Sequence, residues 1–249
     1  MRRVLAAFVL MLAAAPAMAA EQPLVADLSE HLVKITMGFE GAELLLFGAV
    51  EGEGDIVVLV HGPLETLTVR RKARTAGIWM NRDELTFEEV PAFYQVMATS
   101  QPGDWLPDAV RERHQIGVAH LEMPLARDPR RNVDPAAAGA FRIALIRRKQ
   151  ELGHYGIGVG SVKMLSSRLF RTDVMFPTNV PTGTYTVEVL LVQDGEVISA
   201  QSTPLYVSKI GVLADVFSFA HDYAAAYGLA AILFAVLAGL GANAAFRKV

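Results

Sequence analysis

The protein has no cysteine among its 249 residues. This absence excludes a disulfide scaffold, a lipoprotein anchor, a thiolate metal site, a thiol nucleophile and covalently attached c-type haem. A Gly-x-Ser-x-Gly elbow, which would supply a nucleophilic serine, is also missing. The His61-Gly62-Pro63 turn resembles a hydrolase oxyanion loop, but without that nucleophile a turn at the end of a strand is the simpler interpretation. Gly156, Gly158 and Gly160 follow a predicted helix instead of a strand, so nucleotide binding is not expected. These absences predict a protein that is not an enzyme and needs no cofactor.

The histidines lack the spacing that would place two of them on one helical face. The six are His31, His61, His114, His120, His154 and His221. A zinc or copper site could assemble only through the fold, for instance from His114, His120 and Glu122. Histidines at the surface or at the edge of the core are the simpler interpretation, so no metal site is predicted. A metal-binding periplasmic enzyme stays an alternative.

Residues 223–246 contain no charge, and Asn243 is their only strongly polar side chain. A helix rises about 1.5 Å per residue and needs about 20 residues to cross a bilayer core of roughly 30 Å. Tyr223 and Tyr227 lie where interfacial aromatic residues are expected, and basic residues follow at 247–248. We therefore predict a transmembrane helix over residues 223–246 and a cytoplasmic tail over residues 247–249.

The N-terminus has the pattern of a secretory signal peptide. Arg2 and Arg3 precede an apolar run at residues 4–15, and Ala17-Met18-Ala19 places small residues at the two positions that signal peptidase reads. The sequence predicts a signal peptide over residues 1–20, with an uncleaved first transmembrane helix as the alternative. The result would be an exported N-terminal domain with a single membrane span and a cytoplasmic C-terminus.

The part of the chain predicted to be exported is acidic. Removing Arg2, Arg3, Arg247 and Lys248 from the 23 basic residues leaves 19 against 26 acidic residues, a net charge of −7. An acidic surface repels phosphate backbones, so nucleic acid is not expected as a partner.

The strand pattern before residue 101 and after residue 160 predicts a mainly β fold. Residues 44–50 and 55–60 are apolar runs that suit buried strands, and Phe170 to Phe176 alternate apolar and polar. Residues 78–80 and 85–90 predict two further, separate strands. Tyr185 follows a turn glycine at the start of a later strand, as the corner tyrosine of immunoglobulin-like domains does. Asp194-Gly195 then predicts a hairpin turn. We expect Pro204 on an edge strand.

Residues 101–160 predict helices. Asp104 is a candidate N-cap for a short helix through Val110 and beyond, with Pro107 in its first turn. Asp134, Pro135 and Gly153 bracket a second helix, with Ala138, Phe141, Leu145 and Leu152 on one face. The predicted fold is an immunoglobulin-like β-sandwich with an α-helical insertion and a single C-terminal transmembrane helix. Residues 21–100 and 161–208 would form the sandwich, and two successive small β domains are the alternative.

Residues 209–222 connect the predicted sandwich to the membrane span. An apolar stripe in this segment predicts an amphipathic helix at the membrane surface. The stripe comprises Ile210, Leu213, Val216, Phe217 and Ala220.

Two groups of basic residues could form a patch for an inorganic oxyanion such as sulfite or sulfate. The candidate anion-binding residues are Arg70, Lys72, Arg74, Arg147, Arg148 and Lys149. A solvated strand face that prevents edge-to-edge pairing is the simpler interpretation of the first group. An anion-binding module is therefore an alternative function.

Small residues recur at spacings of four and three along one face of the predicted span. They are Ala224, Gly228, Ala231, Ala235, Ala238, Ala242 and Ala245. Small residues let two helix backbones approach closely in lipid, which predicts packing against a partner helix or a second copy. A passive anchor is the alternative.

Three stretches carry a family resemblance: Phe170 to Gly183, Tyr185 to Gly211, and the following anchor to Lys248. Residues 77–81, 90–94 and 140–145 fit as well. The chain resembles the Alph_Pro_TM family of alphaproteobacterial transmembrane proteins over nearly its whole mature length. The resemblance implies a single-pass bacterial inner-membrane protein with a periplasmic N-terminal domain, one C-terminal span and a cytoplasmic C-terminus. The family has no established activity and so supplies no catalytic residues to carry over, and the resemblance implies a sulfite-exporter-type permease as a partner. We therefore predict a membrane-anchored accessory or binding protein that contacts a membrane protein such as a transporter.

Overall fold

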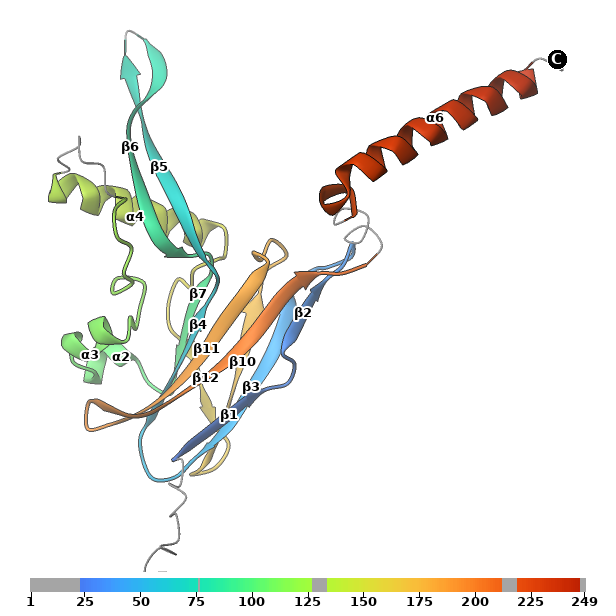
Figure 1. Cartoon of the computed structure of the whole chain (residues 1–249). Helices are drawn as coiled ribbons and strands as arrows, with labels where there is room; N and C mark the ends of the chain where they lie inside the picture. Colours follow the sequence, from blue (N-terminus) through green and yellow to red (C-terminus); the bar gives the residue numbers. More distant parts are fainter. Residues whose placement is uncertain (1–22, 76, 127–133, 212–218, 247–249) are drawn as a thin grey trace, which may run out of the picture.

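The computed structural model describes residues 23–75, 77–126, 134–211 and 219–246. Strand is the main secondary structure, at 46% against 25% helix, and one apolar helix ends the chain, which confirms the predicted class at this level. The predicted signal peptide lies outside the described residues. Two sheets form the body of the molecule, and a long hairpin, three helices and the C-terminal helix are attached to it (Figure 1).

The first sheet, sheet A, has the strand order β1-β3-β10-β9. Its strands are β1 (Leu24–Leu28), β3 (Ala42–Val50), β10 (Leu169–Phe176) and β9 (Lys163–Met164). The second sheet, sheet B, has the order β2-β12-β11-β4-β7-β8. Its strands are β2 (Leu32–Ile35), β12 (Glu196–Lys209), β11 (Gly183–Gln193), β4 (Asp55–His61), β7 (Tyr94–Ala98) and β8 (Gly160–Ser161). Both sheets therefore combine strands from the first and last thirds of the chain.

The inner faces of the two sheets enclose one hydrophobic core. The alternation predicted for residues 170–176 is confirmed, because Phe170, Val174 and Phe176 of β10 are buried in this core. Tyr185 and alternate residues of β11 meet them from sheet B. The rings of Phe176 and Tyr185 lie 5.7 Å apart in an edge-to-face arrangement. Period-two burial of this kind is what joins the two sheets face to face.

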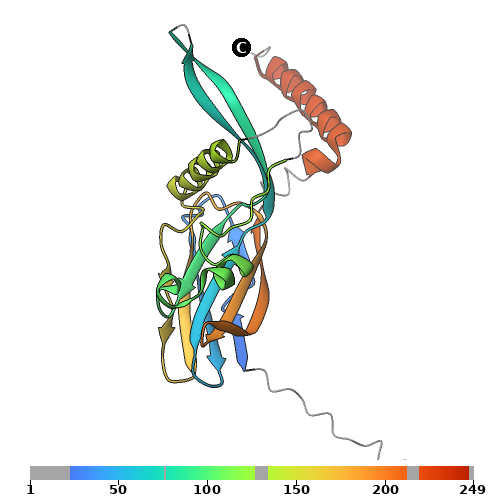
Figure 2. The ribbon, with the colours of Figure 1, turned by 90° about the vertical axis from the view of Figure 1, so that its left-hand side faces the viewer.

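Strand β4 is buried on both faces, which explains its continuous apolar sequence. Ile56, Val58 and Val60 point into the core between the sheets, whereas Val57 and Leu59 contribute to a second core on the outer face of sheet B. The helices and the base of the long hairpin cover this outer face (Figures 1 and 2). Sheet B is thus the central layer of the body.

The long hairpin consists of β5 (Leu64–Thr75) and β6 (Ile78–Pro91), which pair only with each other among the described strands. The sequence predicts separate strands around residues 78–80 and 85–90, but the structure has one continuous strand. At each of two register shifts β6 has one residue more than β5, opposite residues 65–67 and opposite residues 71–72 of β5. Glu89 at the first shift has φ 54°, as a bulge residue does. The hairpin twists and extends away from the two sheets (Figures 1 and 2).

Three helices lie between β7 and β8 in the part of the chain that the structure describes. The single helix predicted to begin at Asp104 is instead two short ones, α2 (Pro102–Trp105) and α3 (Asp108–Arg113). Pro107 separates them, because the residue before a proline is forced out of the helical region, and Leu106 is extended. The longer helix α4 (Pro135–Glu151) confirms its prediction. The Asp134 side chain accepts a hydrogen bond from the backbone of Ala136 at 3.1 Å.

The last strands confirm the turn chemistry of the sequence. Asp194 and Gly195 both have positive φ, as a tight hairpin turn requires. The prediction that Pro204 lies on an edge strand is wrong for β12 as a whole, which lies between β11 and β2. Pro204 itself pairs with β11 only, because β2 joins the other side of β12 from Tyr206 onward. Before that point, the Gln201 side chain donates to and accepts from the Ala26 backbone at 2.8 Å, which ties β12 to the edge strand β1.

The C-terminal helix α6 (Ala224–Phe246) agrees with the predicted span to within one residue. The predicted amphipathic helix over residues 209–222 is only partly described, since residues 212–218 lie outside the described residues. Lys209 belongs to β12 and pairs with Ile35, so a helix beginning at residue 209 is wrong. Residues 219–222 are helical.

Candidate functional site

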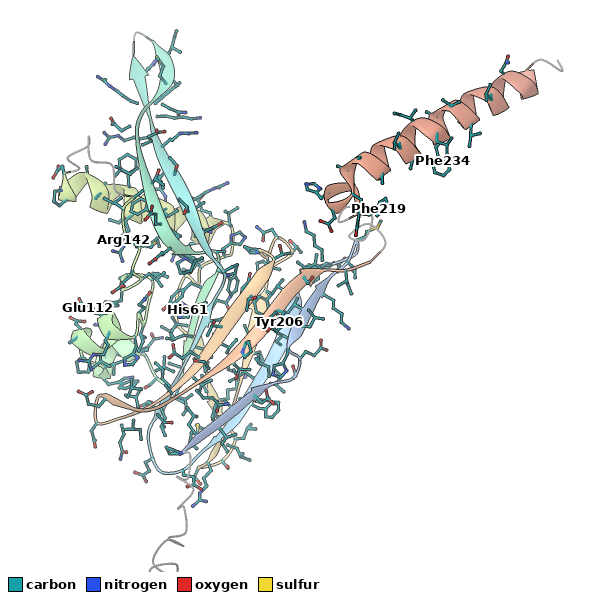
Figure 3. All side chains as sticks on the ribbon, viewed as in Figure 1. His61, Glu112, Arg142, Tyr206, Phe219 and Phe234 are labelled. Carbon is teal, nitrogen blue, oxygen red and sulfur yellow. The ribbon has the colours of Figure 1, made fainter. Side chains whose placement is uncertain are left out.

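Helix α6 has no core to pack on among the described residues. Its apolar window, Ala224–Asn243, has none of its residues buried and carries no charged side chain. Phe234, at 73% exposure, projects from the middle of the helix (Figure 3). Such a helix is unfavourable in water and is satisfied in lipid, where its backbone hydrogen bonds are all internal.

The predicted packing stripe lies on one side of α6. At 100° per residue, its members lie within about 60° of the helix line through Ala224. Larger side chains are on the opposite side, with Leu229, Leu233 and Leu240 each 60% to 70% exposed. Ala245 belongs to α6, but its side chain is outside the described part. The helix therefore has a flat side and a bulky side.

The tip of the β5–β6 hairpin exposes large apolar side chains between cations. Ile78 and Trp79 are each 67% exposed and Met80 is 54% exposed. The register places Arg74 opposite Trp79 and Lys72 opposite Asn81. Cross-strand partners share a face of a hairpin. One face at the tip thus carries Trp79 with cations, and the other carries Ile78 and Met80.

A buried ion pair holds the base of this hairpin against α4. The Lys149 side chain is 7% exposed and donates to the Glu65 carboxylate. Its ammonium also donates to the backbone oxygen of Ala92 at 3.1 Å and lies 5.8 Å from the ring centre of Tyr155. Because the ammonium has these partners, its charge can be buried at the junction of α4, β5 and the connection between β6 and β7.

Two buried tyrosines extend this junction. The Tyr155 hydroxyl donates to the Pro91 oxygen at 2.8 Å, at the last residue of β6. The Tyr94 hydroxyl donates to the Gln115 oxygen at 2.5 Å and accepts from the Gly117 N–H at 2.7 Å. Burial raises the pKa of both phenols, so both stay protonated and act as hydrogen-bond donors. The hydroxyls therefore fix loops and do not act as bases.

Two histidines at the same junction are held neutral. His61 ends β4 at the foot of the hairpin (Figure 3), 5.1 Å from the ring of Tyr94, and burial lowers its pKa. His154 contacts the Asn179 oxygen through Nε2 at 3.1 Å, and burial lowers its pKa as well. Its Nδ1 has no protein partner in the described structure. The arrangement is a packed polar junction that sets the direction of the hairpin.

The structure does not bring the six predicted anion-binding residues together. Lys149 contacts Glu65 at the foot of the hairpin, whereas Arg74 donates to the Gly77 oxygen at its tip. Nine strand residues separate these points, about 30 Å at 3.3 Å per residue. Arg70 pairs with Glu84, and Arg147 and Arg148 face Glu151. A single patch of six cations is therefore incorrect, because most of these charges have acidic partners and one is buried.

The histidine alternative gains no support from the geometry. No group of three His, Asp or Glu side chains suited to a metal ion occurs in the described ranges, which include His114, His120 and Glu122. The expectation that the protein holds no metal stays a prediction.

The outer face of sheet A carries exposed apolar side chains beside charged ones such as Asp27 and Arg171, and the sequence alone does not predict this surface. Val25 and Leu169 flank Ala49 across three neighbouring strands, and Phe47 lies two residues further along β3. Val25, Phe47, Leu169 and Met175 are 46% to 55% exposed. The sequence does place these residues on one face, since they alternate with the buried residues of the same strands. Alternation alone does not show whether another element covers that face.

The geometry defines a class: a membrane protein with a β-rich body and one candidate span near its C-terminus. Among the curated proteins compared, none matches the chain. The chain belongs to the family described as "Putative transmembrane protein (Alph_Pro_TM)", whose family model matches residues 23–248. This match confirms the resemblance drawn from the sequence.

Proposed function

We propose that this protein is a membrane-anchored accessory protein of the bacterial envelope whose β body binds a membrane-protein partner, such as a transporter. The exposed apolar face of sheet A carries the proposal. This sheet A patch, defined as Val25, Phe47 and Leu169, adjoins Ala49 across β1, β3 and β10, whereas Met175 lies apart from it, opposite Glu43. Contiguous apolar surface on a folded domain is typical of interaction sites.

The contrast between the two sheets strengthens this interpretation. Helices and the hairpin cover the outer face of sheet B, and they bury Val57, Leu59 and Leu190 there. Nothing among the described residues covers the sheet A patch. The fold thus uses an insertion to cover one apolar face and leaves the other available for a partner.

The fold supports an immunoglobulin-like assignment, which suits a binding role. Seven strands in chain order, β1, β3, β4, β9, β10, β11 and β12, take the places of strands A to G. In this immunoglobulin strand lettering, the order β1-β3-β10-β9 of sheet A corresponds to A-B-E-D, and the order β4-β11-β12 within sheet B corresponds to C-F-G. The Tyr185 hydroxyl donates to the Pro181 oxygen at 2.6 Å, as a corner tyrosine does.

The proposed topology has a cleaved signal over residues 1–20, an exported body, and a tail over residues 247–249 in the cytoplasm. The absence of cysteine allows a direct test, because a single introduced cysteine is the only thiol. Glu53→Cys, in the exposed turn before β4, should react in intact spheroplasts with a membrane-impermeant maleimide. Val249→Cys should react only after lysis. The reverse pattern would contradict the topology.

The partner is tested in native membranes by photo-crosslinking. A photoreactive phenylalanine at position 47 should capture a discrete membrane protein, and one at position 157 should not. Ile157 is a control of high exposure, because it is 87% exposed and lies in the connection between α4 and β8, outside the sheet A patch. Asp substitution at Val25 and Leu169 should abolish the capture. Equal capture from both positions would refute the sheet A patch as the binding surface.

The contribution of the span is tested separately. Replacing Ala231, Ala235 and Ala238 with leucine should reduce co-purification of the captured protein, because bulky side chains prevent close helix approach. The same change at residues 225, 226 and 230, which are alanines turned away from the stripe, is the control. If both triple variants retain the partner equally, α6 is a passive anchor. A sulfite-exporter-type permease is the partner that the family resemblance suggests.

A further inference from the structure

The hairpin and the connection to the membrane leave the body at the same end. In sheet B, Thr186 of β11 pairs with His61, the last residue of β4, and Gly183 of β11 pairs with Val207 near the end of β12. Strand β5 begins three residues after His61, and β12 ends at Lys209. The register therefore places the foot of the hairpin beside the point where the chain departs for α6.

The hairpin projects from that end (Figures 1 and 2). Its outer part is free of the body: Leu85 and Phe87 are buried in the second core, but every residue from Ile78 to Arg82 is exposed. From Leu64 to Thr75 the strand is about 36 Å long at 3.3 Å per residue. Because residues 219–222 are helical, at most the nine residues 210–218 can be extended, which gives a reach of about 30 Å, and the helical residues add about 7 Å. The tether is thus about as long as the hairpin, so the tip can reach the bilayer that α6 crosses.

The charge at the tip opposes that of the body. Residues 70–84 contain five basic and two acidic residues, a net charge of +3 on a domain that is otherwise acidic. The two acidic residues, Asp83 and Glu84, form salt bridges with Arg71 and Arg70. Lys72, Arg74 and Arg82 form no salt bridge within the described chain, and they border the exposed apolar side chains.

This combination is the one that an anionic phospholipid surface recognises. Tryptophan prefers the interface between headgroups and acyl chains, and lysine and arginine bind the phosphates. The apolar face with Ile78 and Met80 can enter the acyl boundary while the cations stay at headgroup level. The buried Lys149–Glu65 pair and the Tyr155 bond to Pro91 hold the foot rigidly, so the tip has a fixed direction.

We propose that the β5–β6 hairpin is a second membrane contact, which places Ile78, Trp79 and Met80 in the interface of an anionic bilayer and binds lipid phosphates through Lys72, Arg74 and Arg82. The inference requires α6 to span the membrane, but it is independent of the proposed protein partner. It makes the body a two-point attachment, with α6 as one point and the hairpin tip as the other.

The test uses the full chain in vesicles that contain no other protein. Trp105→Phe leaves Trp79 as the only tryptophan, since the chain has two. With phosphatidylglycerol present, Trp79 emission should shift to shorter wavelength, and brominated lipid should quench it. Trp79→Phe keeps Trp105, which packs on the second core and should escape quenching.

Charge reversal tests the lipid phosphates. Lys72→Glu, Arg74→Glu and Arg82→Glu together should abolish the quenching of Trp79, because each cation contributes about fivefold to binding an anionic surface. Reversal of Arg113, Lys163 and Arg168, which are also one lysine and two arginines and are exposed elsewhere on the body, should leave it unchanged.

Three results would overturn the proposal. The first is Trp79 emission that stays water-exposed and unquenched in phosphatidylglycerol vesicles. The second is equal quenching in purely zwitterionic vesicles, which shows that the cations give no preference for an anionic surface. The third is a photo-crosslink from position 79 to a protein in native membranes without quenching in vesicles, which makes the tip a protein contact. None of these bears on the sheet A patch, so the two proposals fail separately.

Discussion

The Lys149–Glu65 ion pair at the foot of the hairpin should respond unequally to the loss of either partner. Lys149 is 7% exposed and Glu65 is 37% exposed, although the two form one ion pair. Removing Glu65 leaves an ammonium enclosed by the Ala92 backbone and the Tyr155 ring, whereas removing Lys149 leaves a carboxylate that can turn toward water. Glu65→Ala should therefore destabilise the protein more than Lys149→Met does.

The magnitudes follow from burial. Breaking a buried pair by removing one partner costs about 3–5 kcal/mol, and the partial exposure of Glu65 puts Glu65→Ala near the lower limit, at about 3 kcal/mol. Lys149→Met keeps the volume of the side chain and strands the Ala92 oxygen, for a cost of about 2 kcal/mol. The double variant should lose about 2–3 kcal/mol, well below the sum, because neither charge is left buried alone.

Urea unfolding of the full chain in detergent measures these differences. With Trp79 replaced by phenylalanine, Trp105 reports the second core, on which α4 packs. At a slope of about 2 kcal/mol per molar urea, Glu65→Ala should lower the midpoint by about 1.5 M. The reasoning is refuted if Lys149→Met has the larger effect, or if the double variant loses the full sum.

Three further predictions concern stability. Tyr185→Phe should cost about 1 kcal/mol through loss of its bond to a backbone oxygen in the preceding turn, while Tyr206→Phe, at a 51% exposed site, should cost almost nothing in the same urea assay. Gly48→Ala should destabilise the protein by about 1–3 kcal/mol, because the added Cβ would lie 2.5 Å from the Phe170 ring. Gly139→Ala in α4 should stabilise it by up to about 1 kcal/mol, because nothing in the described structure packs within 4 Å of the added Cβ and alanine favours the helix. Effects of the same sign for the two variants would contradict this prediction. Burial lowers the pKa of His61 in the folded protein, so as the pH falls the unfolded chain takes up a proton at this residue before the folded one does. The free energy of unfolding should therefore decrease as the pH drops below about 6.5, the ordinary pKa of histidine. His61→Phe should reduce this dependence of stability on pH, and an unchanged dependence would refute the prediction.

Local chemistry explains which elements the sequence predicts well. The Asp134 cap and Pro135 bound α4, and the alternation from Phe170 to Phe176 gives β10 its buried face. The apolar run at 223–246 needs only its length and lack of charge to be recognised as a span. These signals act within a few residues of one another, so no knowledge of the fold is needed to read them.

Long-range pairing explains the failures. Lys149 resembles a solvated cation at a helix end, but its partner Glu65 is 84 residues away in the chain. Residues 81–84 look like a break between strands because they are polar, yet cross-strand pairing with β5 carries them through as one strand. The sheet A patch is similar, since only the tertiary arrangement shows which face the insertion covers. Burial of polar residues and exposure of apolar ones both depend on partners that periodicity does not identify.

The Gln201 side chain, which bonds the Ala26 backbone across 175 positions, has a consequence for biogenesis. On the proposed topology the chain crosses the membrane from its N-terminus, so β1 emerges first, before the side chain that bonds its edge. The hydrogen bonds from Gln201 to β1 can form only when residue 201 has crossed, and α6 begins 23 residues later. Completion of the body and lateral release of the anchor into lipid therefore occur almost together. A partner already in the membrane would then meet a domain that is closing beside it.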